Sequence, residues 1–128
     1  MGYWETEGQW GVLIKYFPEQ GDIVFIDFDP QAGHEQKGRR PALVISNNTF
    51  NQFTNITMVC PITNTNTNRN FPLHIELDKR TKTTGVIMCE QVKSLDIYAR
   101  NMSFYEKATK DFLKEVIDII IGFVENEK

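Results

Sequence analysis

A β-rich stretch near the start of the chain decides the fold: Gly21-Asp22-Ile23-Val24-Phe25-Ile26-Asp27-Phe28-Asp29-Pro30. Gly21-Asp22 is a turn signal, the following residues favour a strand, and Asp29-Pro30 closes the run. Similar runs downstream predict further strands over residues 41–46, 56–62, 73–77, 84–89 and 91–95. The polar segment 31–39, which contains Gly33 and Gly38, is expected to be a loop.

The last segment of the chain has a helical period. Its apolar residues recur at steps of three and four: Phe112, Leu113, Val116, Ile117, Ile120, Phe123 and Val124. Thr109 is the expected N-cap, and the pair Ser103 and Glu106 is an alternative capping box further upstream. Ile119 and Ile121 widen the apolar stripe, which hints at contact with a second surface, although core packing is favoured. Short strands followed by one helix predict a small, strongly bent sheet or barrel with a helix on one side.

Composition indicates one soluble globular domain of 128 residues, with 41% hydrophobic and 24% charged residues. No apolar run approaches the roughly 20 residues that a membrane span needs, so we expect a cytoplasmic protein without a membrane partner. The net charge of −3 is unevenly distributed. Residues 1–36 carry one basic and seven acidic side chains, residues 37–100 nine and four, and residues 101–128 four and six. The basic middle region can dock a polyanion, but a solvated surface explains the charge equally well.

Cys60 and Cys89 are the two cysteines, and they lie far apart in the sequence. We expect buried apolar thiols in a reducing compartment. A zinc site made by these cysteines with His34 and His74 would lack the usual close pair of ligands, so no metal is expected.

The loop before the second strand is the densest cluster of functional side chains: Gly33-His34-Glu35-Gln36-Lys37-Gly38-Arg39-Arg40-Pro41. Arg40 adjoins Pro41 and the start of a strand, so its guanidinium is well placed for a phosphate. A solvated, charged turn is an equally good explanation from the chemistry alone. The Asn- and Thr-rich segment 63–70 is expected to be a surface loop, and contact with a ligand is the alternative.

Several of these segments, in their order and spacing, resemble the MazF/PemK family of toxins. They are residues 22–30, the run from Gly33 to Ser46, Cys60-Pro61-Ile62-Thr63, the run from Thr84 to Asp96, and Arg100. The resemblance covers about residues 20–123. It leaves residues 1–19 as an N-terminal extension and makes residues 20–128 the MazF/PemK-like domain.

The resemblance implies an SH3-like small β-barrel of the CcdB/PemK/MazF type with a C-terminal α-helix, which forms a homodimer. It implies a sequence-specific endoribonuclease, or mRNA interferase, that cuts single-stranded RNA without a metal or other cofactor. The ribose 2′-hydroxyl attacks the neighbouring phosphate, which leaves a 2′,3′-cyclic phosphate and a 5′-hydroxyl. A cognate antitoxin protein inhibits the enzyme, and DNA is bound only through the complex with the antitoxin.

Catalytic residues follow from the resemblance position by position. Arg40 would stabilise the pentavalent phosphate, and Thr63 would hydrogen-bond it. Glu35, His34 and Glu90 are the candidates for the general base, and the choice among them stays open. Met88 stands where the PemK-like branch has a second catalytic arginine, so Arg40 is expected to bear most of the phosphate charge.

Other residues are expected to contact the RNA without taking part in the chemistry: Gln36, Lys37, Arg39, Asn64 and Gln91. Phe28 and Phe53 can stack on bases, but core positions are more common for phenylalanine. The alternatives to an enzyme are a non-catalytic CcdB-like toxin and an RNA-binding barrel. Arg40 and Thr63 beside Glu35 favour the enzyme, and the absence of evident stacking aromatics on the strands counts against the RNA-binding barrel.

Overall fold

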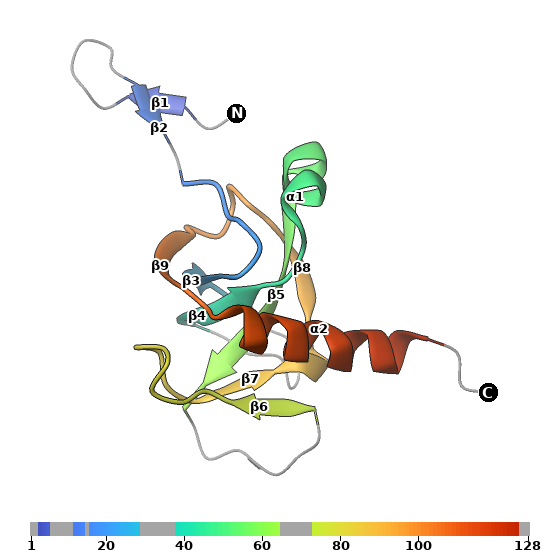
Figure 1. Cartoon of the computed structure of the whole chain (residues 1–128). Coiled ribbons are helices and arrows are strands. Elements are labelled where there is room, and N and C mark those ends of the chain that lie inside the picture. Colours follow the sequence, from blue (N-terminus) through green and yellow to red (C-terminus); the bar gives the residue numbers. More distant parts are fainter. Residues whose placement is uncertain (1–2, 6–11, 15, 29–37, 65–72, 126–128) are drawn as a thin grey trace.

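The computed structural model describes residues 3–5, 12–14, 16–28, 38–64 and 73–125 (Figure 1). Near the N-terminus, β1 (Tyr3–Glu5) and β2 (Val12–Ile14) form a two-stranded antiparallel sheet. The main sheet contains β3 (Asp22–Asp27), β4 (Arg39–Val44), β5 (Ile56–Thr63), β6 (His74–Glu76), β7 (Val86–Met88), β8 (Lys93–Asp96) and β9 (Ser103–Lys107). The helices are α1 (Asn48–Thr54), the 3₁₀ turn η1 (Cys89–Gln91) and α2 (Lys110–Val124).

The main sheet is antiparallel, and its strands follow the order β6-β7-β5-β4-β3-β9. One edge of β5 is shared by two strands: β8 pairs with residues 56–59 and β7 with residues 62–63. The η1 turn lies between β7 and β8 in the chain, so it connects the two strands that share this edge of β5. The predicted bent β-sheet with a C-terminal helix is confirmed, and no pairing closes β6 onto β9 among the described strands.

Side chains from the sheet enter two apolar clusters because alternate residues of a strand point to opposite faces. Figure 1 shows α2 lying across the sheet, and Phe112 and Val116 of α2 pack with residues such as Ile23, Leu43, Ile62 and Ile87. The opposite face contains the second cluster: Val24, Ile26, Phe28, Ala42, Val44, Val59 and Leu95. No helix in the described part of the chain is long and apolar enough to cross a membrane.

The two cysteines are buried and free, as predicted. A hydrogen bond with the Cys89 thiol, together with burial, raises the pKa of Cys60 far above its ordinary range. The Cys60 thiol therefore stays protonated at neutral pH and acts as an apolar core group.

Helix α2 begins where the sequence predicts. Thr109 is the N-cap, and its hydroxyl accepts a hydrogen bond of 3.3 Å from the Phe112 amide. The alternative capping box is wrong, because Ser103 and Glu106 belong to strand β9. The Glu106 carboxylate instead accepts bonds from the amides of Lys82 and Thr83, at 3.0 and 2.8 Å, and from the Thr83 hydroxyl at 2.6 Å.

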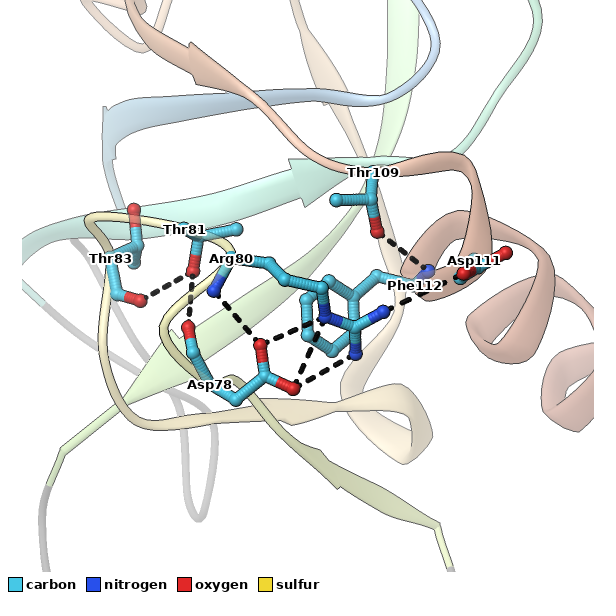
Figure 2. A network of polar contacts seen from close by, with 7 residues as sticks. All are labelled: Asp78, Arg80, Thr81, Thr83, Thr109, Asp111 and Phe112. Carbon is cyan, nitrogen blue, oxygen red and sulfur yellow. Dashed lines mark hydrogen bonds and ion pairs between the residues drawn. The ribbon is translucent and has the colours of Figure 1, made fainter.

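A polar network ties the loop before β7 to the start of α2 (Figure 2). The Arg80 guanidinium donates to both carboxylate oxygens of Asp78, with distances of 2.9 Å from Nε to Oδ1 and from Nη2 to Oδ2. It also lies over the Phe112 ring, 4.2 Å from its centroid, and pairs with Asp111 at 3.6 Å. Arg80 belongs to the basic middle region, but its contacts are those of a structural residue.

Helix α1 was not predicted. Asn47 caps it by accepting a hydrogen bond of 2.8 Å from the Phe50 amide, and Asn55 ends it with a left-handed backbone at φ 57°. Phe53 in this helix is 82% exposed, so the core position favoured for it is wrong. Phe28 is 1% exposed, and its core position is confirmed.

Candidate functional site

Arg40 and Thr63 meet at the ends of two neighbouring strands. The register of β4 and β5 pairs Ala42 with Pro61, and its continuation places Arg40 opposite Thr63. The Arg40 guanidinium Nη1 donates to the Thr63 hydroxyl over 3.3 Å. Thr63 is only 1% exposed and Arg40 is half-buried, so both side chains are held by the sheet. A guanidinium beside a hydroxyl suits an anionic ligand such as a phosphate.

Gly85 allows the backbone to approach Thr63 closely. Its φ is +116°, and a Cβ at this position would lie 2.4 Å from the Thr63 carbonyl oxygen and 2.9 Å from its carbon. No real side chain fits at that distance, and the backbone conformation favours glycine. Gly85 therefore helps to fix the position of Thr63.

A second pair of polar side chains lies on the same face of the sheet as Arg40. Register pairs Thr63 with Val86 and Met88 with His74, so these residues share the face opposite α2. The His74 Nε2 lies 3.1 Å from Oε2 of Glu90 in η1. The His74 side chain is only 8% exposed. The register and the contact with Glu90 account for this burial.

Lys93 adds positive charge to this face, and the sequence analysis did not select it. Its Nζ lies over the ring of buried Phe28, 5.7 Å from the centroid. Phe28 belongs to the same cluster as Ile26, which pairs with Arg40. The signal that was available is its place two residues after Gln91, within a segment that resembles the family.

Arg39 points away from Arg40, because consecutive residues of a strand face opposite sides. Its guanidinium pairs with Asp27 at 3.2 Å and donates to the Asn101 carbonyl at 2.7 Å and to the Ser103 hydroxyl at 3.0 Å. These contacts are structural, and an RNA contact by Arg39 stays a prediction.

The structure describes only some of the other predicted site residues. Asn64 follows Thr63, and its side-chain amide donates to the Thr84 hydroxyl at 2.9 Å. Gln91 is half-buried in η1, next to Glu90. Four predicted residues lie outside the described part of the chain: His34, Glu35, Gln36 and Lys37. Within the described part, no group of three or more His, Cys, Asp or Glu side chains could hold a metal.

Fold and site together define a small antiparallel β-protein with a C-terminal helix and an arginine–threonine pair suited to an anionic ligand. Residues 19–123 match the model of the "PemK-like, MazF-like toxin of type II toxin-antitoxin system" family. The chain is 36% identical to endoribonuclease PemK of Escherichia coli over 101 residues, which cover 77% of this chain and 76% of PemK.

Solved structures agree with the sequence match. MazF from Deinococcus radiodurans superposes with a TM-score of 0.79 and 34% identity, over 86% of this chain and 98% of that one. A MazE–MazF structure from the same organism gives a TM-score of 0.74 at 34% identity, over 86% of this chain and 97% of that one. The chain belongs to the MazF/PemK family of type II toxins, and its homologues are endoribonucleases.

Proposed function

We propose that the protein is a sequence-specific endoribonuclease that cuts single-stranded RNA without a metal, leaving a 2′,3′-cyclic phosphate and a 5′-hydroxyl. The observation that supports this most strongly is the contact between the Arg40 guanidinium and the Thr63 hydroxyl, at the ends of strands β4 and β5. Residues 20–128 would carry this activity, with residues 1–19 as an extension. The cytoplasm is the expected compartment.

The reaction needs three contributions from the protein. A base removes the proton of the 2′-hydroxyl, whose oxygen then bonds to phosphorus as the bond from phosphorus to the 5′-oxygen breaks. A second acid–base group or a water molecule gives the leaving 5′-oxygen its proton. The crowded phosphate gains negative charge on the way, and the Arg40 guanidinium stabilises that charge while Thr63 holds the phosphate in place. Arg40 contributes charge and N–H donors, because a guanidinium stays protonated in proteins. Glu35, His34 and Glu90 are the candidates for the base.

A cognate antitoxin is the expected protein partner. The MazE–MazF structure from D. radiodurans, at 34% identity to this chain, supports that expectation. Contact with DNA would occur only through the complex with the antitoxin. A second copy of the chain is the other expected partner, as a homodimer.

The direct test is RNA cleavage in the presence of EDTA by the wild type and by Arg40→Ala. We expect the wild type to cut and Arg40→Ala to be slower by about 10²–10³-fold, as when one transition-state donor is removed. Lys114→Ala is the matched control, since Lys114 is an exposed cation on α2 that pairs with Asp118 at 3.1 Å. Intact RNA with the wild type would favour a toxin that acts by binding alone. Equal cutting by Arg40→Ala would refute the role proposed for Arg40.

A further inference from the structure

We propose that His74 and Glu90 form a base-reading subsite, which accepts a hydrogen bond from a nucleobase carrying an exocyclic amino group. The inference rests on the proposed RNA cleavage and adds a substrate preference to it. Glu90 would contact the nucleobase directly, which leaves Glu35 and His34 as the candidates for the general base. His74 would be a positioning residue that orients the Glu90 carboxylate.

One oxygen of Glu90 contacts His74, and the Glu90 side chain is partly exposed. Oε2 lies 3.1 Å from His74 Nε2, and the His74 side chain is 8% exposed, so the imidazole is a rigid partner. The Glu90 side chain is 31% exposed. No other hydrogen bond to Glu90 occurs within the described part of the chain. A carboxylate held in this way presents Oε1 as an acceptor in a defined direction.

Strand register places this pair near the phosphate site but not on it. Arg40, Thr63 and Val86 form one row across the face, and Pro61, Met88 and His74 form the next row. Adjacent strands are about 4.8 Å apart, so three strand spacings separate the positions of Arg40 and His74 by roughly 14 Å. This separation of the two backbone positions lets the Arg40 site and the His74–Glu90 pair contact neighbouring nucleotides of one RNA strand.

The charge of Glu90 favours a role in recognition. A carboxylate on a surface that binds a polyanion opposes binding unless it accepts a hydrogen bond from that ligand. Ionised carboxylates only accept, and the amino groups of adenine, cytosine and guanine only donate. Uracil lacks an amino group. Its single N–H lies between two carbonyl oxygens, and these acceptors would face the acceptor oxygen of the carboxylate. The pair is therefore expected to select against uracil at one position of the RNA.

Cut sites mapped on a mixed RNA test this proposal. The wild type should disfavour uracil at one position near the cut by at least about 10-fold, as a specific base contact provides. Glu90→Gln, whose amide can both donate and accept, should reduce that preference to about 3-fold or less at the same position only. His74→Leu should do the same, because it removes the donor that orients Glu90. His74→Gln should retain the preference, because its amide N–H can replace Nε2.

Controls separate a loss of recognition from a loss of folding. Ile75→Val alters a 7% exposed core residue on the opposite face of β6, and it should leave every positional preference unchanged. Unchanged preferences in Glu90→Gln and His74→Leu, with an even fall in rate at all sites, would overturn the proposal. So would a wild type without any position that disfavours uracil. A wild type that leaves RNA intact would instead refute the proposed function itself.

Discussion

Arg39 and Arg40 are neighbours in the chain, yet β4 directs their side chains to opposite faces of the sheet. Arg40 contacts Thr63, while Arg39 is bound by Asp27, Asn101 and Ser103. The Arg-Arg-Pro sequence predicted a cation held at a strand start, and the strand period identifies which arginine faces the site. The sequence could not predict the contact between His74 and Glu90, because it depends on the register of β6 and β7 and on the η1 turn.

Thr63→Val tests the hydroxyl in the anion site. Valine has nearly the same shape, but it cannot accept the hydrogen bond from Arg40 or bond to a phosphate. We expect cleavage to fall by at least about 10-fold, in line with the loss of one charge-assisted hydrogen bond. Thr63→Ser, which keeps the hydroxyl, should stay within a few-fold of the wild type in the same rate assay. Equal rates for the valine and serine variants would exclude a role for the Thr63 hydroxyl.

Gly85→Ala tests whether the residue next to the Thr63 backbone must lack a side chain. An added Cβ would lie 2.4 Å from the Thr63 carbonyl oxygen, at a φ of +116°. We expect a loss of about 1–3 kcal/mol in the free energy of unfolding, measured in urea, and slower cleavage. Gly122→Ala in α2 is the matched control. A Cβ at Gly122 meets nothing within 4 Å, so alanine should stabilise the helix by up to about 1 kcal/mol. A neutral Gly85→Ala would contradict the close approach.

The strands and helices of this protein differ in how readily the sequence predicts them. Helix α2 and the central strands have long apolar sequence patterns whose residues are buried, and these elements were predicted. Helix α1 has seven residues with only Asn51 buried, so it has no apolar stripe to detect. Strand β9 lies at the edge of the sheet, with Glu106 as its one half-buried residue, so the apolar alternation of a strand is missing.

Glu106 connects β9 to the loop before β7, and its pH dependence can be measured. Burial of the carboxylate raises its pKa, but the hydrogen bonds from Thr83 and from the Lys82 amide lower it more, so the net pKa is below its usual range. A lowered pKa in the folded state stabilises the protein above the unfolded pKa near 4.3, and this stability is lost as the pH falls through the folded value.

Glu106→Gln should therefore reduce the free energy of unfolding by about 1–2 kcal/mol at pH 7, through its weaker hydrogen bonds. The difference from the wild type should shrink as the pH falls below about 4.3, because the unfolded carboxylate then takes up a proton while the folded one, with its lowered pKa, is still ionised. Urea unfolding of both proteins between pH 3 and 7 measures this. A difference that stays constant over the whole range would show that the charge of Glu106 contributes nothing.

At the scale of the whole molecule, the end of α2 remains apolar and exposed. Ile121, Phe123 and Val124 are 45%, 44% and 70% exposed. Ile121 also lines a cavity of about 270 Å³ between α1 and α2, together with Phe50, Met58, Ile117 and Ile120. The sequence favoured core packing for Ile119 and Ile121 and hinted at a second surface. Ile119 packs against the core beside α2, whereas Ile121 is exposed, and the second surface stays a prediction. The composition predicted a single domain but not which face a partner covers.

Ile121→Glu tests the expected homodimer. A charge in an apolar contact between two copies would cost several kcal/mol, so we expect the variant to be a monomer where the wild type is a dimer. Light scattering after size-exclusion chromatography measures the mass, and circular dichroism checks that α2 is intact. Lys114→Glu, on an exposed polar position of the same helix, should remain dimeric. A monomeric wild type, or a dimeric Ile121→Glu, would rule out this surface.

The chemical nature of the new RNA ends distinguishes attack by the 2′-hydroxyl from attack by water. Attack by the 2′-hydroxyl requires a 5′-hydroxyl on one fragment and a 2′,3′-cyclic phosphate on the other. Fragments made in EDTA can be treated with polynucleotide kinase, with and without prior phosphatase. We expect the downstream fragment to accept phosphate from the kinase without phosphatase treatment. A 5′-phosphate at the cut would contradict the mechanism built on Arg40 and Thr63.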